Sequence, residues 1–323
     1  MHILPVSFAL LSYTGYWRPV HFPVNSLKYW MYNTYSVFMF ILLQSFVFYG
    51  IVDTFVLSAS LDEFIDKCYL FLSVFGVSCK IVHLFIRREK IINLDMMLLK
   101  DNCIPRDIEE ILIKKKFDRH ASVAHETLIS GMMIQICAQF EILCHRAHML
   151  PTLLMEAEKN SKSDEDLVVR EKTIIRDLIY HHLYVYKFAY MVNATFTMMI
   201  FVQFSFISLV LCMSIYKLSA MKSLFTLDFA YTFSYLCSML TQIFLYCWYG
   251  NEVSLKSIDV STAIYEMDWT TLRIRVMKDL MIIMMRASKP VKISSGYIVT
   301  LSTESFMSIL KLSYSAYNFL KDS

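Results

Sequence analysis

The sequence has little charge, little glycine and little proline for its length. Of its 323 residues, 18% are charged, six are glycine, six are proline and 56% are hydrophobic, and the mean hydropathy is +0.47. Soluble domains carry charge on about 25% of their residues. This composition excludes an ordinary water-soluble domain and predicts an all-α, polytopic helical membrane protein.

The sequence also lacks the motifs of common enzyme and metal sites. It contains no phosphate-binding loop, nucleophile elbow or zinc-ligand pattern, so we expect no enzymatic activity, no cofactor and no metal. His145 and His148 have a spacing that could share a metal, but no third ligand of fitting spacing accompanies them. The basic residues lie in short segments rather than on one face, which argues against a nucleic-acid partner. Most of the eight cysteines lie in or beside apolar runs and are expected to be buried and reduced.

Six apolar runs are candidates for membrane-spanning helices. They cover residues 32–52, 68–86, 121–143, 183–216, 225–249 and 293–321. A helix of ~20 residues crosses the ~30 Å hydrocarbon core of a bilayer. Lys80 interrupts the second run, and an ammonium near a bilayer centre costs about 2.5–3.5 kcal/mol on insertion scales. We expect Lys80 to snorkel toward the basic end of its run, or alternatively to face the bundle interior.

The basic segments contradict a simple topology. They are the N-terminus and residues 87–119, 146–176 and 256–292, all of which the positive-inside rule assigns to the cytoplasm. This assignment gives a cytoplasmic N-terminus. The first two runs can then cross the membrane and return as a hairpin, and so can the fourth and fifth. The run at 121–143 has a basic segment on each side, and one span cannot keep both ends inside. Either this run does not cross, or a basic segment is translocated, or a span is missing beside it.

The last run, Ile293–Lys321, combines the length of a span with a polar stripe. It follows Pro290, and its roughly 25 helical positions at ~1.5 Å each could cross a bilayer. Polar residues recur along one face at steps of three and four: Thr300, Glu304, Ser308, Lys311, Ser315 and Asn318. Such a helix faces lipid on one side and, on the other, either a pore or helices with which Ser and Thr form hydrogen bonds.

Short motifs along the chain resemble those of insect odorant receptors, in the order usual for that family. They are Gln203-Phe204, Tyr246 to Glu252 (YCWYGNE), Ala263-Ile264-Tyr265, Asp268-Trp269, Met285-Arg286, Lys289-Pro290, Leu301-Ser302, Glu304-Ser305-Phe306 and Leu310 to Asn318 (LKLSYSAYN). The series lies within residues 184–320. Further upstream, Gln139, Glu141-Ile142-Leu143 and His145-Arg146 match the fourth span of the family and the loop after it. The chain is similar to a tuning subunit of the odorant-gated channel.

The chain departs from this family at one place. Members usually have seven spans and a cytoplasmic N-terminus, but here nothing between Arg119 and Ala124 has room for a third span and its outer loop. The gap adjoins the run at 121–143 that contradicts the topology. Both observations predict a missing third span, as in a shortened isoform, an omitted exon or a degenerating copy.

The resemblance implies a non-selective cation channel in the plasma membrane of sensory neurons, in which this subunit and the family co-receptor form a tetramer. A small volatile odorant would bind in the outer half of the bundle, which would contain Tyr69, Phe71, Phe75, Met132, Met133, Phe204, Phe229 and Phe233. The final helix would line the pore with Glu304, Ser308, Lys311, Tyr314, Ser315, Tyr317, Asn318 and Leu320. Residues 251–292 would form the cytoplasmic anchor between subunits, with Trp269, Leu280 and Met284 as contacts. For each of these side chains, ordinary packing is the alternative.

Three other functions stay open from the sequence. A gustatory-type ligand-gated channel has the same architecture and differs in its ligands. A heptahelical G-protein-coupled receptor has an outer N-terminus, against which the basic N-terminal segment argues. The third is a non-functional, truncated isoform.

Overall fold

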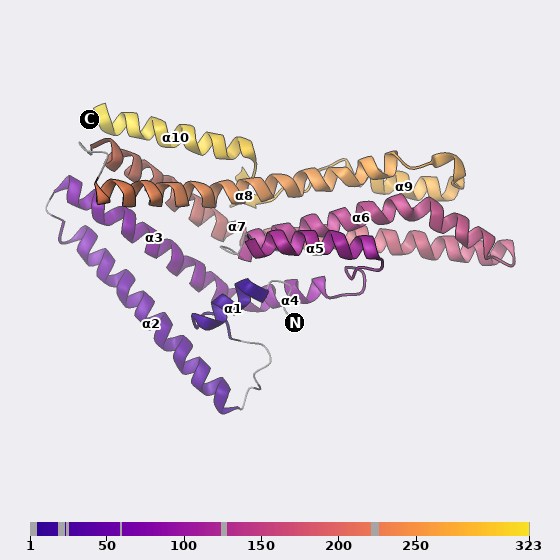
Figure 1. Ribbon diagram of the computed structural model, residues 1–323, viewed down its shortest axis with the longest axis horizontal. Helices are drawn as coiled ribbons and strands as arrows, with labels where there is room; N and C mark the ends of the chain where they lie inside the picture. Colours follow the sequence, from indigo (N-terminus) through magenta and orange to yellow (C-terminus); the bar gives the residue numbers. More distant parts are fainter. Residues whose placement is uncertain are drawn as a thin grey trace.

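The structure is a computed structural model that describes residues 5–18, 23, 26–58, 60–123, 128–220 and 226–322. Within these residues the chain is almost entirely helical (Figure 1). The elements are α1 (Pro5–Tyr13), α2 (Leu27–Phe55), α3 (Leu61–Ile86), α4 (Arg88–Leu98), α5 (Ile108–Val123), α6 (Leu128–Lys159), α7 (Asp164–Ala220), α8 (Leu227–Tyr265), the 3₁₀ helix η1 (Trp269–Thr271), α9 (Ile274–Ala287), β1 (Ser294–Ser295), β2 (Val299–Thr300) and α10 (Thr303–Asp322). The predicted all-α fold is confirmed, with one small β-hairpin before the last helix.

Four helices in the described part of the chain are long and apolar enough to cross a membrane. They are Leu27–Phe55, Glu63–Ile86, Leu128–Lys159 and Asp164–Ser219. In the first, only 6% of the most apolar window is buried, so its side chains need a lipid environment, whereas in Leu128–Lys159 the buried share is 83%. The helix α6 is therefore apolar because it lies inside the protein, between α5, α7 and α8.

The predicted third run, 121–143, is not one helix. Ala121 is in the last turn of α5, and α6 begins at Leu128 and runs back along α5 (Figure 1). An ion pair and a histidine hydrogen bond hold this hairpin: Lys116 Nζ lies 3.2 Å from Glu141 Oε1, and His145 Nε2 lies 2.9 Å from Asp107 Oδ2. The basic segments on either side of the run consequently lie on the same side of the molecule. Of the sequence-based alternatives, this hairpin favours the one in which the run does not cross.

The hairpin also determines the direction of the last helix. Figure 1 shows the C-terminal end of α10 at the same end of the molecule as the turn between α2 and α3 and the start of α8. The end of α6 and the start of α9 lie at the opposite end. The helix α10 therefore runs away from the basic segment 256–292, as the positive-inside rule requires.

The predicted start of the last helix was wrong. The chain after Ile293 forms the antiparallel pair β1–β2, and α10 begins only at Thr303. The turn between the strands has Gly296 at φ 58° and Tyr297 at φ 61°, and a Cβ added at Gly296 would lie 2.9 Å from the Phe201 ring. Backbone in the left-handed region ends a helical pattern. The 20 residues of α10 still extend for ~30 Å.

Candidate functional site

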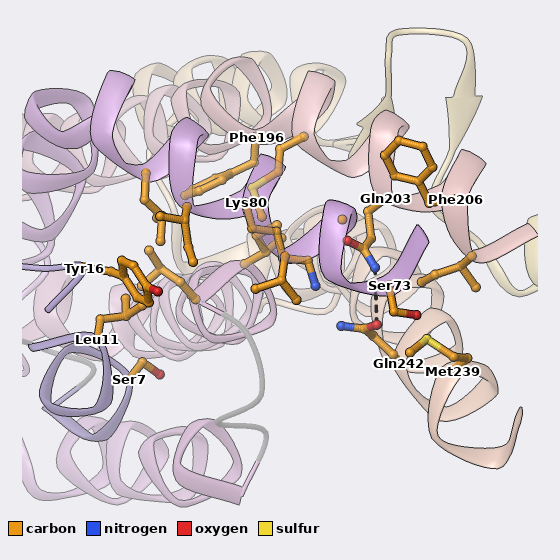
Figure 2. Close-up of a pocket in the computed structure, with 18 of the residues that line it drawn as sticks. Ser7, Leu11, Tyr16, Ser73, Lys80, Phe196, Gln203, Phe206, Met239 and Gln242 are labelled. Atoms are coloured by element: carbon orange, nitrogen blue, oxygen red, sulfur yellow. Dashed lines mark hydrogen bonds between the residues drawn. The ribbon is translucent and has the colours of Figure 1, made fainter. Parts of the chain in front are cut away.

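A pocket of about 530 Å³ lies between α3, α7 and α8, and residues of α1 and of the first turn of α6 also line it (Figure 2). Its walls are mostly apolar, with Leu72, Ile81, Phe196, Met199 and Ile207 among them. Ligand sites typically have volumes of about 300–1,000 Å³ and mainly hydrophobic linings. The cavity therefore has the size and surface of a binding site for a small apolar molecule.

Polar side chains interrupt the apolar lining at two places: Ser7, Thr14 and Tyr16 lie at the α1 end, and a second group lies on the three long helices. Lys80 and Ser73 come from α3, Gln203 from α7 and Gln242 from α8. The amide Nε2 of Gln203 donates a hydrogen bond to Oε1 of Gln242 at 3.3 Å. Ser73 and Tyr235 form a hydrogen bond that connects α3 with α8 beside this pair. The polar groups thus join three helices where they surround the cavity.

Lys80 does not occupy the position that the sequence favoured. We expected it to snorkel toward the basic end of its run, but it is half-buried and lines the cavity. Figure 2 shows its ammonium pointing toward the amides of Gln203 and Gln242. Lys80 therefore faces the bundle interior, which was the alternative that the sequence allowed.

The segment around α1 forms one wall of the cavity, which the sequence did not predict. Phe8 and Trp17 are buried with ring centroids 4.9 Å apart. The hydroxyl of Tyr32 donates to the backbone carbonyl of Trp17 at 2.9 Å, and the Arg88 guanidinium lies 5.3 Å from the Trp17 ring centroid. An apolar start of the chain is a weak signal, because nothing in it specifies the distant residues that it contacts.

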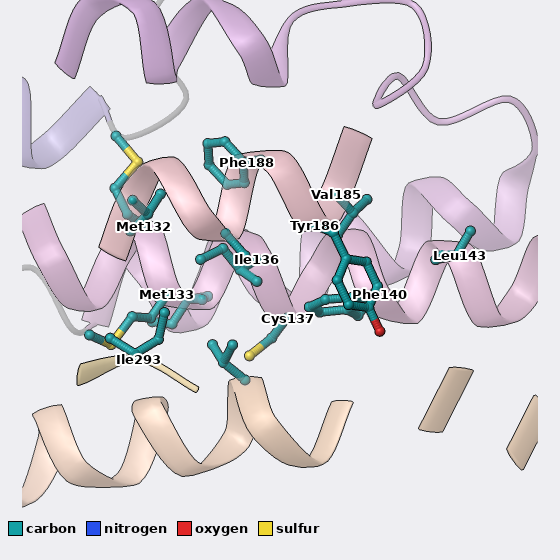
Figure 3. Packing of buried hydrophobic residues seen from close by; sticks show 14 of the residues in the cluster. Met132, Met133, Ile136, Cys137, Phe140, Leu143, Val185, Tyr186, Phe188 and Ile293 are labelled. Atoms are coloured by element: carbon teal, nitrogen blue, oxygen red, sulfur yellow. The ribbon is translucent and has the colours of Figure 1, made fainter. Parts of the chain in front are cut away.

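Three of the predicted ligand residues, Met132, Met133 and Phe204, are buried in the core and do not line the cavity. Met132 and Met133 are 0% exposed and pack in the core between α6 and its neighbours (Figure 3). Phe204 is buried against Tyr246, with ring centroids 6.4 Å apart. The cavity face of α7 carries Gln203 instead.

The remaining aromatic candidates form two separate groups. Phe71 and Phe75 contact each other, and Phe75 meets Phe206 edge-on at 5.3 Å, so it supports a cavity wall from behind. Phe229 and Phe233 stack with centroids 6.0 Å apart on the surface of α8. The side chain of Tyr69 lies outside the described residues. Phe75 thus contacts a lining residue without lining the cavity itself.

The predicted polar stripe is present on α10, and its described side chains are exposed. Glu304, Ser308, Lys311, Ser315 and Asn318 are all exposed, as is Tyr314. The side chains of Tyr317 and Leu320 lie outside the described residues. On the opposite face Ser313 is buried, and its backbone carbonyl lies 3.9 Å from the Cys212 sulfur of α7. The described part of the stripe therefore faces away from the helices of its own chain.

The three predicted anchor contacts are not equivalent in the structure. Leu280 is 0% exposed and packs in the core of its own subunit, so it is not available to a partner. Trp269 and Met284 are half-buried against the same core. The exposed apolar residues of α9 are Ile274, Met281, Ile282 and Met285. The sequence identified the amphipathic helix but not its outward face.

A buried ion pair attaches helix α6 to α5 and to the segment that connects α4 with α5. The Arg146 guanidinium contacts both carboxylate oxygens of Glu110, at 2.7 and 2.9 Å, and donates to the backbone carbonyl of Asn102 at 2.8 Å. The backbone N–H of Glu110 donates to Asp107 at 2.7 Å. That bond, with a smaller contribution from His145, lowers the pKa of the Asp107 carboxyl. This network explains structurally the motif His145-Arg146.

Comparisons with known proteins agree with this architecture. The family model described as 7tm Odorant receptor matches residues 120–314. Odorant receptor 10 from Aedes albopictus is 28% identical over 144 residues, which are 45% of this chain and 38% of that receptor. Odorant receptor Or2 from Anopheles gambiae is 26% identical over 147 residues, 46% of this chain and 38% of that receptor. Each match spans less than half of the relative's length.

Two solved structures of the insect olfactory receptor OR5 from Machilis hrabei have a similar fold. The one in complex with eugenol has a TM-score of 0.65 at 15% identity, covering 99% of this chain and 97% of that chain. The other has a TM-score of 0.73 at 14% identity, covering 98% and 97%. The family match includes more than half of the chain and all of the helices α6 to α9. The chain belongs to the 7tm Odorant receptor family, whose members are receptors and not enzymes.

Proposed function

We propose that this chain is the odorant-binding subunit of a ligand-gated cation channel, and that its ligand binds in the cavity between α3, α7 and α8. The observation that supports this proposal most directly is that one stretch of α7 contacts both the cavity and the β-hairpin that precedes α10. Ligand binding and pore opening could then be connected through a single helix.

The two faces of this stretch of α7 have different partners. One face carries Phe196, Met199 and Gln203, which line the cavity. The other face holds the β-hairpin: the Thr197 hydroxyl donates to the backbone carbonyl of Ser294 at 2.8 Å. A helix that shifts when the cavity fills must move the hairpin with it, because these contacts lie within two turns of each other.

The helix α10 has the surface that a pore wall needs. Its exposed polar stripe would be unfavourable against lipid, but it is suited to a water-filled path between subunits. The hairpin connects directly to α10 through Ser302 and Ser305, whose hydrogen bonds start the helix. A displacement of the hairpin would consequently tilt or rotate α10.

The subunit contacts that we propose lie on α9 and the end of α8. Ile282 is 66% exposed on α9, and Met285 and Tyr265 are more exposed still. A groove beside them is lined by Ser261, Thr262 and Met284. Exposed apolar side chains with a polar rim are typical of subunit interfaces. The partner that we propose is the family co-receptor, in a hetero-tetramer at the plasma membrane.

Co-expression with the co-receptor tests this proposal. We expect an odour panel to evoke cation currents from cells with both subunits. A version with a third span inserted between α5 and α6 serves as the comparison. Currents from the inserted version alone would favour a truncated, non-functional isoform, and silence from both, at normal surface expression, would contradict the channel.

A glycosylation site added after α10 tests the topology independently. If the α5–α6 hairpin does not cross, the proposed crossings are α2, α3, α7, α8 and α10. Five crossings from a cytoplasmic N-terminus bring the C-terminus to the outside, where the added site is modified. An unmodified site would mean that α6 crosses the membrane, and it would remove the proposed orientation of α10.

A further inference from the structure

The helices α2 and α3 separate toward one end and leave a cleft between them. In their middle, Gln44 Nε2 donates a hydrogen bond to the Ser78 hydroxyl at 2.9 Å. Closer to the end of α3, the rings of Phe40 and Phe85 meet edge-on with centroids 5.7 Å apart. Figure 1 shows the two helices close together at the turn that joins them and apart where α2 begins. From the Phe40–Phe85 pair onward, a cleft of about 340 Å³ lies between them, the α2–α3 cleft.

The α2–α3 cleft has apolar walls and a polar rim. Val37 of α2 and Ile86 of α3 both line it and are 53% and 74% exposed. Exposed apolar side chains beside a hollow suit a hydrocarbon chain, and in a spanning helix pair that chain can come from the bilayer. Asn33 and Ser36 form the rim. The Ser36 hydroxyl donates to the Gly15 carbonyl at 2.5 Å, so the rim is attached to the segment after α1.

Two arginine residues meet at the rim end of the cleft. Arg88 Nη2 donates a hydrogen bond to the backbone carbonyl of Arg18 at 3.0 Å. The Arg18 guanidinium lies 4.3 Å from the centroid of the Tyr29 ring, and Tyr29 is one helical turn before Asn33 on the same face of α2. Arg88 follows two residues after Ile86, the last lining residue of α3. Both arginines therefore lie where the apolar walls end.

The two arginines carry positive charge that the described part of the chain does not neutralise. Neither Arg18 nor Arg88 forms an ion pair with a carboxylate among the described residues, and Glu89, next to Arg88 in sequence, is exposed. Burial, with a smaller contribution from the charge of Arg18, lowers the pKa of the Arg88 guanidinium. Lys28 and Lys90, both exposed, add further positive charge at this end. A bound anion would stabilise such a cluster.

We propose that the α2–α3 cleft binds a phospholipid of net negative charge, with an acyl chain between the helices and the headgroup phosphate at Arg18 and Arg88. Guanidinium groups match phosphate oxygens with paired hydrogen bonds. The positive-inside rule assigns this end of the helices to the cytoplasm, and the cytoplasmic leaflet is the one that contains the anionic lipids. The bound lipid holds α2 against α3 at the end where their own side chains do not meet. This site is separate from the cavity between α3, α7 and α8.

Thermal unfolding of the full chain in mixed micelles measures the binding. The probes are phosphatidylserine, phosphatidylcholine with the same acyl chains, and glycerophosphoserine, which is the headgroup without chains. We expect phosphatidylserine to stabilise at a mole fraction about tenfold or more below that of phosphatidylcholine, because each arginine near the headgroup contributes about fivefold. Equal stabilisation by the two lipids would overturn the headgroup site. Equal stabilisation by glycerophosphoserine would overturn the role of the cleft.

Substitution of the arginines tests the headgroup site directly. Arg18→Gln and Arg88→Gln should each reduce the preference for phosphatidylserine about fivefold, and the double variant should abolish it. Arg88→Lys keeps the charge and should retain most of the preference. If Arg88→Gln does not fold, Arg18→Gln and Arg88→Lys are compared instead. An unchanged preference in Arg18→Gln would contradict the proposal.

The matched control for the arginines is Lys159→Gln. Lys159 is exposed at the end of α6, far from α2 in Figure 1. It should leave the lipid preference unchanged. A loss equal to that of Arg18→Gln would mean that the lipid is attracted by the overall positive charge of the chain, and it would overturn the site.

A bulky substitution in the cleft tests the position of the acyl chain. Val37→Trp should raise the half-maximal mole fraction of both lipids about threefold or more, because the chain loses its contacts with the two helices. The ratio between the lipids should stay the same, since the arginines are intact. Leu42→Trp is the control, because Leu42 is 51% exposed on α2 and does not line the cleft. Equal effects of the two variants would contradict binding in the cleft.

Discussion

The backbone N–H of Ser294 donates a hydrogen bond to Oδ1 of Asn193 at 2.9 Å, and so ties the strand before α10 to the middle of α7. Thr197 forms two further hydrogen bonds with the hairpin. Its backbone carbonyl accepts from the Gly296 N–H at 3.0 Å, and its hydroxyl donates to the Ser294 carbonyl at 2.8 Å. Asn193 and Thr197 lie one turn apart, on the face of α7 away from the cavity. The contact between α7 and the hairpin is therefore made by paired polar groups in a largely apolar region.

Replacing Asn193 should separate ligand binding from pore opening. Asn193→Leu leaves the half-buried Ser294 N–H without this acceptor, at a cost below the roughly 1–3 kcal/mol of a fully buried group. We expect the maximal current per surface receptor to fall, while ligand-induced thermal stabilisation is retained. Thr195→Ala is the control, because within the described residues the Thr195 hydroxyl donates to the Met191 carbonyl of its own helix. A full current in Asn193→Leu would show that the hairpin is not coupled through this bond.

Breaking the buried ion pair between Arg146 and Glu110 should destabilise the whole protein. Glu110 is 2% exposed, and removal of one partner of a buried pair typically costs about 3–5 kcal/mol because a charge is left uncompensated. Arg146→Met should therefore reduce surface expression and the melting temperature in detergent. The double variant with Glu110→Gln should recover part of the loss.

An exposed ion pair on α7 provides the matched comparison for Arg146. Arg170 Nε lies 3.0 Å from Asp166 Oδ2, and both side chains are exposed. Such i,i+4 pairs contribute about 0.3–0.5 kcal/mol, so Arg170→Met should leave the melting temperature nearly unchanged. Equal effects of Arg146→Met and Arg170→Met would mean that burial does not determine the energetics of this network.

The sequence predicted the helices better than it predicted their ends. The apolar pattern predicts a helix over 183–216, but α7 starts at Asp164, and its polar first part has no apolar pattern that marks it as helical. The acids at 164–166 were a readable start signal, since acidic residues favour the first turn of a helix. The late start of α10 was harder to foresee. It depends on Gly296 lying against Phe201, which is a contact between distant residues.

The cavity was less predictable than the fold. Aromatic and methionine side chains were sound candidates for binding a volatile, but Met132 fills the core and Phe204 packs on Tyr246. Which face of a helix lines a cavity depends on how the neighbouring helices pack. The chain carried one local signal that could have found the site: Lys80, a charge inside an apolar run.

The charges on α10 should affect conduction if this helix lines the pore. Lys311 and Glu304 are both exposed on the stripe, about two turns apart. Lys311→Gln removes a positive charge from a cation path and should raise single-channel conductance, whereas Glu304→Gln should lower it. Lys289→Gln, an exposed residue before the hairpin, is the control. Unchanged conductance in both α10 variants would place the stripe outside the ion path.

The wall formed by α1 should matter for ligand binding as well as for stability. Trp17 is 1% exposed and packs on Phe8, so Trp17→Ala should cost about 3–5 kcal/mol, as is usual for a buried large aromatic residue. Because α1 then loses its attachment, we expect the half-maximal ligand concentration to rise together with the loss of thermal stability. Trp17→Phe retains an aromatic ring, so its thermal stability and its half-maximal ligand concentration should lie between those of the unsubstituted protein and of Trp17→Ala. The control is Trp30→Ala, since Trp30 is 63% exposed on α2 and its removal should change neither quantity appreciably. A destabilised Trp17→Ala with unchanged ligand sensitivity would mean that α1 supports the bundle without enclosing the ligand.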